Sequence, residues 1–130
     1  MENCVFCKIV SGQIPCSRVY EDDSLLAFLD INPINPGHTL VIPKKHVDNV
    51  FGMDDDAYHS LFSSAKKVSG AIQTATGAKR IGVVVEGFLI PHAHVHLVPI
   101  NSGGELSFGR AKKATAESLA EVSAKIRAHL

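Results

Sequence analysis

Pro91-His92-Ala93-His94-Val95-His96-Leu97-Val98-Pro99 is the stretch of this sequence that decides the fold. Three of the seven histidines stand here at two-residue spacing, separated by apolar residues. In an extended strand alternate side chains share a face, so we expect the histidines on one face and Ala93, Val95 and Leu97 in the core. At about 3.3 Å per residue the outer imidazoles would lie about 13 Å apart, so one metal ion could not easily bind all three without distorting the strand.

Such a row of imidazoles favours phosphate chemistry. One neutral imidazole can attack phosphorus while its neighbours hold oxygens or fix its tautomer. The alternative is a polar strand face that carries histidine without a catalytic role.

Composition limits the class of protein. The 130 residues are 45% apolar and 20% charged, an ordinary balance for a globular domain with a buried core. Lys plus Arg equals Asp plus Glu at 13 each, so neither a nucleic-acid groove nor a polybasic membrane patch is predicted. No signal-peptide pattern and no apolar run of bilayer length is visible. We therefore expect one cytoplasmic domain over residues 1–130, with no nucleic-acid or membrane partner.

Hydrophobic periodicity predicts three helices and five strands. Strands are expected over residues 18–21, 25–29, 38–43, 81–85 and 93–100, mostly joined by short turns. Helices are expected over residues 4–11, from Asp54 to Gly77, and after a cap at Thr115. This order predicts an α+β fold: a five-stranded antiparallel sheet with a short N-terminal helix, a long central helix and a C-terminal helix.

A pair of cysteines near the N-terminus suggests a metal or redox site. Cys4-x-x-Cys7 supplies two soft ligands at zinc-knuckle spacing, and His46 and His92 are the candidates for the second half of a tetrahedral site. Spacing alone leaves a free or redox-active thiol pair equally open. The odd number of cysteines, with Cys16 unpaired, argues against a disulfide framework.

Two polar residues flank the proline-rich loop over residues 30–37. Asp30 follows a buried strand, where a carboxylate can hold the vicinal diol of a ribose. A turn aspartate that bonds its own backbone is the more ordinary interpretation. His38 begins the next strand, where it either supports the histidine row or is exposed.

Three segments together resemble a known family. CVFCKIVSGQIP (4–15), FLDINPINPGHTLVIPKKH (28–46) and PHAHVHLVP (91–99) are similar, in order and spacing, to the histidine triad (HIT) superfamily of nucleotide hydrolases and transferases. The resemblance covers most of residues 4–100. It implies that His94 attacks the α-phosphate and forms a nucleotidyl-imidazole intermediate, that His96 contacts the phosphate, and that His38 supports them.

The resemblance also implies a ligand set. It implies a Zn²⁺ ion held by Cys4, Cys7, His46 and His92. Asp30 matches the family's ribose-binding acidic residue. The base pocket is expected at Val5, Phe6, Ile9, Phe28 and Ile31. The implied substrate is an AMP-like purine nucleotide in a nucleoside phosphoramidate or a dinucleoside polyphosphate, and a homodimer is expected.

The connection before the triad departs from the family pattern. Val85 stands where an asparagine is usual, and residues 86–91 replace a longer connection that ends in a Gly-Gln-Ser/Thr turn. In the family those polar groups help to hold the phosphate and the leaving group. The histidine row makes a hydrolase the first expectation. The missing polar groups make a nucleotide-binding or scaffold protein with little turnover the alternative.

Overall fold

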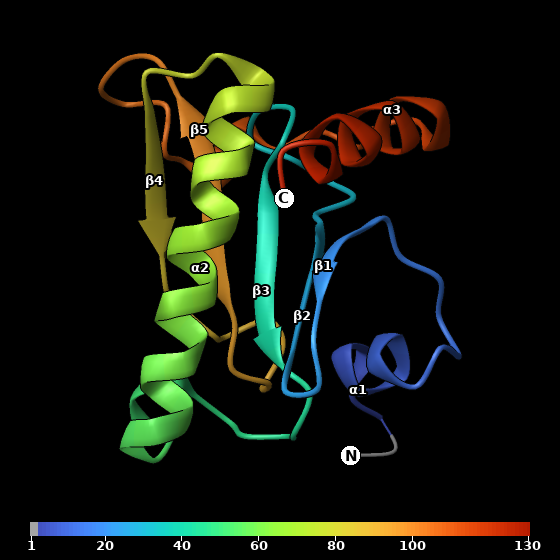
Figure 1. The fold of residues 1–130 in the computed structure, drawn as a ribbon, viewed down its shortest axis with the longest axis vertical. Helices are drawn as coiled ribbons and strands as arrows, with labels where there is room; N and C mark the ends of the chain where they lie inside the picture. Colours follow the sequence, from blue (N-terminus) through green and yellow to red (C-terminus); the bar gives the residue numbers. More distant parts are fainter. Residues whose placement is uncertain (1–2) are drawn as a thin grey trace.

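The computed structural model describes residues 3–130. These residues form a five-stranded antiparallel sheet with helices on both faces (Figure 1). The strands are β1 (Arg18–Glu21), β2 (Leu25–Leu29), β3 (Thr39–Pro43), β4 (Arg80–Val84) and β5 (Val95–Ile100), in the order β1-β2-β3-β5-β4. The helices are α1 (Val5–Val10), α2 (Asp55–Thr76) and α3 (Ala116–Arg127), with 3₁₀ turns η1 (Val50–Gly52) and η2 (Phe108–Arg110). The predicted α+β fold class is confirmed.

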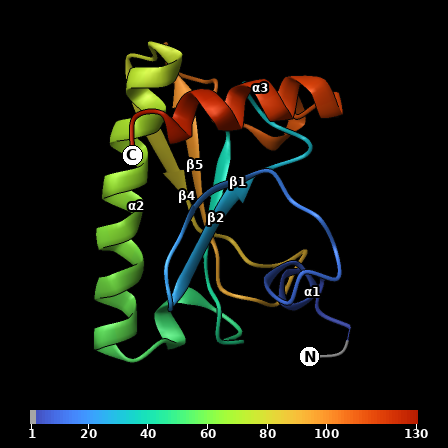
Figure 2. The same ribbon diagram turned by 45° about the vertical axis from the view of Figure 1, so that its right-hand side comes forward.

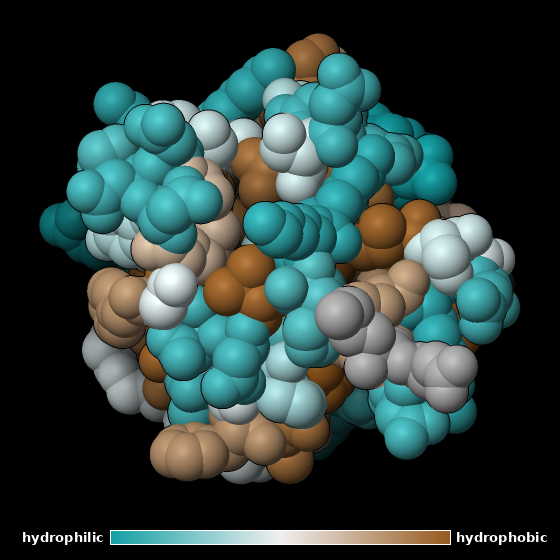
Figure 3. Space-filling model, turned by 90° about the horizontal axis from the view of Figure 1, so that it is seen from below, coloured by the Kyte–Doolittle hydropathy of each residue, from teal (hydrophilic) through white to brown (hydrophobic). Residues whose placement is uncertain are grey.

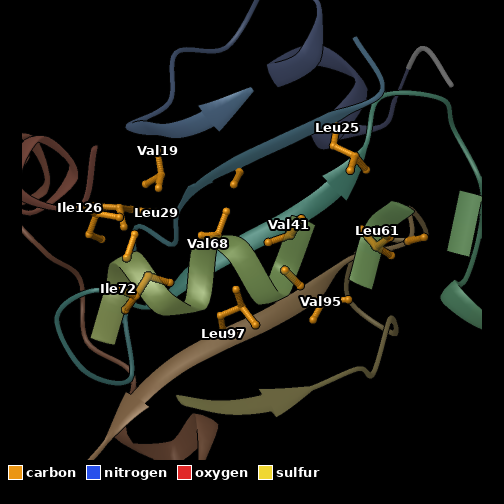
Figure 4. Packing of buried hydrophobic residues seen from close by; sticks show 14 of the residues in the cluster. Val19, Leu25, Leu29, Val41, Leu61, Val68, Ile72, Val95, Leu97 and Ile126 are labelled. Atoms are coloured by element: carbon orange, nitrogen blue, oxygen red, sulfur yellow. The ribbon is translucent and has the colours of Figure 1, made fainter. Parts of the chain in front are cut away.

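The long helix α2 covers one face of the sheet (Figure 4). It begins after Asp54, whose carboxylate accepts the backbone N–H of Ala57 at 2.9 Å, and it ends at Gly77, which has φ +70°. One side of the helix supplies buried residues at helical spacing, namely Leu61, Ala65, Val68, Ala71 and Ile72. These pack on β3 and β5, whose Val41, Val95 and Leu97 belong to the same core. No helix in residues 3–130 is long and apolar enough to span a membrane.

The opposite face of the sheet carries the short helix α1 (Figure 2). A smaller core cluster lies here, made of Cys4, Phe6, Leu26, Phe28, Leu40 and Ile42. Leu40 on β3 pairs with His96 on β5, and Val95 beside it faces α2. Because side chains alternate along a strand, His96 faces the side of α1.

The last helix, α3, and the segment before it tie the C-terminal part of the chain to the proline-rich loop. Thr115 caps α3 by accepting the N–H of Ser118 at 3.1 Å, and Ile126 is buried in the main core. Just before the cap, the N–H of Ala114 bonds to the carbonyl of Ile31 at 2.9 Å. The loop that carries Asp30 is thus tied to the segment before α3.

The start of β5 differs from the expectation. The strand begins at Val95 rather than at residue 93, so His92 and His94 precede it, although both contact Phe6 of α1 on the side that His96 faces. The physical reason for the later start is that the register puts Pro43, which has no N–H to donate, opposite Ala93, and that the N–H of Ala93 bonds instead to the carbonyl of Val47. The prediction for the other side is confirmed, since Ala93, Val95 and Leu97 are in the main core.

Candidate active site and metal centre

The structure divides the predicted site residues into two neighbouring groups. The metal group consists of Cys4, Cys7, His46 and His92, with one potential ligand atom of each within 4.8 Å of the others. The relay group consists of Asp30, His38 and His96, which meet the same limit. His94 connects the two, because its Nδ1 lies 2.6 Å from the carbonyl oxygen of His92 and its ring centroid 5.0 Å from that of His96.

The metal group has the spacing of a tetrahedral site. Cys4 caps α1 and one helical turn brings Cys7 beside it. The Sγ of Cys4 lies 3.4 Å from Nδ1 of His92, and the Sγ of Cys7 lies 3.2 Å from Nδ1 of His46. Tetrahedral zinc with ordinary bond lengths puts sulfur and nitrogen ligands about 3.6 Å apart. The four side chains therefore fit a metal ion.

The tautomer of His92 leaves a nitrogen lone pair that could bind a metal ion. Its Nε2 lies 2.8 Å from the carbonyl oxygen of Pro43, which has no proton to give, so the ring proton is on Nε2. The Nδ1 lone pair is left facing the thiols, in the way that metal-binding histidines are oriented. Burial lowers the pKa of His92, which keeps the ring neutral. Burial, followed by the neighbouring Cys4 thiol, raises the pKa of Cys7 in the metal-free protein.

The relay group has the same tautomer as His92, but here the Nε2 proton of His38 lies between two rings. The backbone N–H of Ile34 donates to Nδ1 of His38 at 3.0 Å, so the proton of neutral His38 is on Nε2. That Nε2 donates to Nδ1 of His96 at 2.9 Å, which leaves His96 with its own N–H at Nε2. Burial lowers the pKa of both His38 and His96 to about 4, so both rings are neutral at physiological pH.

The loop between β2 and β3 positions Asp30 and His38. Gly37 has φ +101°, and a Cβ there would lie 2.9 Å from Cγ2 of Thr76, so only glycine fits directly before His38. Asp30 accepts the N–H of Asn32 at 2.8 Å with one carboxylate oxygen, as a turn aspartate does. Its other oxygen lies 3.6 Å from Nε2 of His38. Burial raises the pKa of Asp30.

His94 has one ring nitrogen that the protein leaves without a hydrogen-bond donor or acceptor in the described residues. The carbonyl of His92 can only accept, so Nδ1 of neutral His94 carries the proton and Nε2 carries a free lone pair. The ring of Phe6 packs edge to face on His94 with a centroid distance of 5.1 Å. The orientation of the His94 ring is thus fixed by the His92 carbonyl and the Phe6 ring and not by a charged side chain.

The residues expected to bind a base fall into two sets. Phe6 and Phe28 pack edge to face at 5.6 Å, and Ile9 packs against the same cluster. Val5 and Ile31 are exposed, by 42% and 59%. Phe6 and Phe28 are thus a buried aromatic pair between α1 and the sheet, whereas Val5 and Ile31 are exposed aliphatic side chains.

Sequence reasoning missed one contact of the site. Phe108, in η2, lies with its ring centroid 4.9 Å from that of His96 and 6.3 Å from that of His38. The segment over residues 101–115 has no motif, and the one available signal was a single aromatic residue in a polar stretch. Asn35 in the proline-rich loop holds this segment through a bond to Glu105 at 3.0 Å.

Comparison with known proteins agrees with the site. The HIT domain family matches residues 11–103, so the chain belongs to the HIT family. It is 38% identical to the adenosine 5'-monophosphoramidase hnt1 of Schizosaccharomyces pombe, over 75% of this chain and 74% of that protein. It is also 38% identical to the adenylylsulfatase HINT3 of Arabidopsis thaliana, over 75% of this chain and 52% of that protein.

A solved structure is similar over nearly the whole chain. The zinc-bound histidine triad family protein of Mycobacterium smegmatis superposes with a TM-score of 0.85 at 30% identity, covering 98% of this chain and 93% of that one. The antiparallel sheet with its three helices is therefore the fold of this family.

Proposed function

We propose that this protein is a nucleotide hydrolase that cleaves the bond between an α-phosphate and its leaving group through a nucleotidyl-histidine intermediate. The substrate is an AMP-like nucleoside phosphoramidate or a dinucleoside polyphosphate. The single observation that carries the proposal is the pair of complementary tautomers, a free lone pair on His94 beside an N–H donor on His96. The names of two HIT relatives, a monophosphoramidase and an adenylylsulfatase, support the same bond class.

The two tautomers divide the chemistry. Nε2 of His94 attacks the α-phosphorus, and the bond to the leaving group breaks with its electron pair going to that group. His96 donates its Nε2–H to a phosphate oxygen as charge shifts in the transition state. Water then attacks phosphorus and restores His94. For a phosphoramidate, the net reaction consumes one water molecule. One of its hydrogens goes to the amine that leaves, and its hydroxyl goes to the phosphate of AMP.

The nucleoside is proposed to lie on the α1 face of the sheet. Asp30, with one oxygen not used by its turn bond, accepts hydrogen bonds from the ribose hydroxyls. Five apolar side chains form the base pocket: Val5, Phe6, Ile9, Phe28 and Ile31. The connection between this pocket and the catalytic row is Phe6, which touches both Phe28 and His94.

A matched pair of variants tests the hydrolase. His94→Asn removes the nucleophile and is expected to lower kcat on adenosine 5'-phosphoramidate by about three orders of magnitude or more. His59→Asn, an exposed position on α2, is expected to keep the wild-type rate. Hydrolysis by His94→Asn at the wild-type rate contradicts the proposal.

We propose zinc as the ion of the metal group. The sulfur–nitrogen distances, the tautomer of His92 and the zinc-bound HIT protein of M. smegmatis support it. Bound zinc supplies a structural link between α1 and the segments that carry His46 and His92. Metal analysis is expected to find about one zinc per chain, lost in Cys7→Ser and kept in Cys16→Ser. A zinc content unaffected by Cys7→Ser contradicts the assignment.

A homodimer is proposed to use the β4 edge of the sheet. In the part of the chain that the structure describes, β4 pairs on one side only, with β5, and Val83 is 50% exposed. The connection after it carries Phe88 and Leu89, exposed by 88% and 97%. Seen from below, apolar patches interrupt the mainly hydrophilic surface (Figure 3). Val83→Lys is expected to give monomers in sedimentation, whereas Leu130→Lys leaves dimers; dimers from both variants refute this edge.

A nucleotide-binding protein with little turnover is the second candidate. The observation in its favour is the apolar connection before the triad, where Val85 packs against the main core and Phe88 and Leu89 offer no polar donor side chains. This candidate predicts AMP binding in calorimetry together with background hydrolysis by the wild type. Robust hydrolysis by the wild type removes it.

A further inference from the structure

A phenyl ring from the C-terminal part of the chain closes one end of the histidine row. The rings of Phe108 and His96 meet edge to face, with centroids 4.9 Å apart and an interplanar angle of 72°. At the other end, Phe6 meets His94 in the same geometry at 5.1 Å. The rings of His94 and His96 are themselves 5.0 Å apart. Two phenyl rings, from the first and the last quarter of the chain, thus bracket the two imidazoles.

The turn that carries Phe108 is built onto the loop that leads to His38. The side-chain amide of Asn35 donates to the carboxylate of Glu105 at 3.0 Å and to the carbonyl of Pro99 at 2.9 Å. The guanidinium of Arg110 donates back to the amide oxygen of Asn35 at 3.1 Å. Every polar atom of the Asn35 side chain is therefore used to hold the turn in place.

The turn is also stabilised from within. The carboxylate of Glu105 accepts the N–H of Asn101 at 3.0 Å and the hydroxyl of Ser102 at 2.8 Å. The N–H of Lys112 bonds to the carbonyl of Pro33 at 3.3 Å. Phe108 is consequently held against His96 by a network that involves both the turn and the proline-rich loop.

The surroundings of His96 show what the ring does there. The titratable groups that face His96 are His38, His94 and Asp30, and Phe108 is the aromatic cover. His96 is only 8% exposed, and the ring of Phe108, which is 41% exposed, packs against it, so the phenyl ring covers part of the imidazole on the side toward solvent. Water admitted at this point would compete for the bond between His38 and His96.

We propose that Phe108 is a positioning residue for His96: it keeps the bond from His38 to His96 dry and holds the Nε2–H donor in one direction. The role toward a phosphate rests on the proposed function, but the effect on His96 itself does not. Because a misplaced catalytic group costs rate rather than fold, the expected consequence is on turnover and on the titration of one ring.

Nitrogen-15 NMR of the imidazoles tests the effect on His96 in the absence of substrate. In Phe108→Ala the titration midpoint of His96 is expected to rise by about one pH unit, with a mixture of the two tautomers, because the ring gains water. Phe108→Leu, which keeps apolar cover, is expected to shift it less, and it decides the question if the alanine variant does not fold. Leu106→Ala is the matched control, since this side chain of the same segment packs on Gly82 of β4.

Activity is the second readout. Phe108→Ala is expected to lower kcat on adenosine 5'-phosphoramidate about tenfold with a smaller change in KM, and Leu106→Ala to keep both. His96 midpoints and tautomers that are the same in wild type and the Phe108 variants overturn the proposal, as does an equal shift in Leu106→Ala. A shifted His96 in a protein whose wild type hydrolyses nothing supports the positioning role and refutes the proposed function.

Discussion

The metal group and the relay group contain similar side chains, but their protons are arranged for different tasks. In the metal group His92 gives its Nε2 proton to the carbonyl of Pro43, so a lone pair faces the thiols. In the relay group the N–H of Ile34 donates to Nδ1 of His38, so the proton of His38 is on Nε2 and lies between two rings. In the metal group a backbone acceptor binds Nε2–H of His92 and leaves Nδ1 for a ligand. In the relay group a backbone donor binds Nδ1 of His38 and leaves Nε2–H for His96.

The positions of the protons distinguish the two groups, whereas the distances between their ligand atoms do not. The ligand atoms of Asp30, His38 and His96 are as close together as those of the metal group. A metal ion on Nε2 of His38 would require the proton to move to Nδ1, where it would face the N–H of Ile34. The relay group is therefore suited to hold a donor on His96 and not to bind a metal.

The largest expected effect is the loss of a ligand from the metal group. In the zinc-loaded protein, Cys4→Ser is expected to lower the free energy of unfolding by about 3–5 kcal/mol, because the metal-binding energy contributes to folding. Cys16→Ser, at a half-buried cysteine outside the group, is expected to cost less than about 1 kcal/mol. Urea denaturation with metal analysis measures both, and equal small losses would show that the group binds no metal.

Acid is expected to act on the relay group. Burial holds the pKa of His38 and His96 at about 4, against about 6.5 in the unfolded chain. Between these values the unfolded state binds more protons, so this contribution to stability is complete above about pH 6.5 and is lost as the pH falls toward 4. We expect it to reach about 3 kcal/mol for each ring, with the raised pKa of Asp30 acting in the opposite direction.

Two variants isolate that contribution. His38→Asn removes one buried ring and is expected to make the free energy of unfolding less dependent on pH, whereas the exposed His59→Asn keeps the wild-type slope. Urea denaturation at several pH values gives the slopes. The same slope in His38→Asn and the wild type would show that the relay rings are not buried neutral.

Asp30 offers a smaller effect on binding. Asp30→Asn keeps an oxygen for the turn but removes the charge, so AMP affinity in calorimetry is expected to fall about tenfold, the value of one hydrogen bond to a charged group. Asp23→Asn, at the exposed β1–β2 turn, is expected to leave the affinity unchanged. Unchanged AMP affinity in Asp30→Asn would remove this residue from the nucleotide site.

The last prediction is that His38→Asn leaves the number of bound metal ions unchanged. Titration with Co²⁺ is expected to produce thiolate-to-metal absorption with about one equivalent bound in both the wild type and His38→Asn. A second equivalent in the wild type that disappears in His38→Asn would mean that the relay group binds metal after all.

Local pattern was sufficient to predict the sheet and the helices. The apolar run over β2, the aspartates before α2 and the threonine before α3 have their causes within a few residues, and the structure has the elements where these signals predict them. The start of β5 could not be predicted in the same way. It depends on Pro43 ending the neighbouring strand and on a bond between Ala93 and Val47, which are contacts between distant segments.

The candidate site was partly accessible to sequence reasoning. Residue types pointed to the metal group, because two cysteines need two further ligands and His92 was available in the row. The tautomers were not accessible, since they depend on the backbone of Ile34 and Pro43, and these residues carry no chemical signal in the sequence. Phe108 was missed for the same reason: its position depends on Asn35 and Glu105, which read as turn residues.

The proposed roles of the four histidines depend most directly on which nitrogen of each imidazole carries the proton, and nitrogen-15 NMR at neutral pH reports this nitrogen. We predict that His94 carries its proton on Nδ1, whereas His38, His92 and His96 carry theirs on Nε2. That result would leave His94 as the ring with its Nε2 lone pair free for attack. A His94 protonated on Nε2 would contradict the account, because the proposed nucleophile would have no lone pair to offer phosphorus.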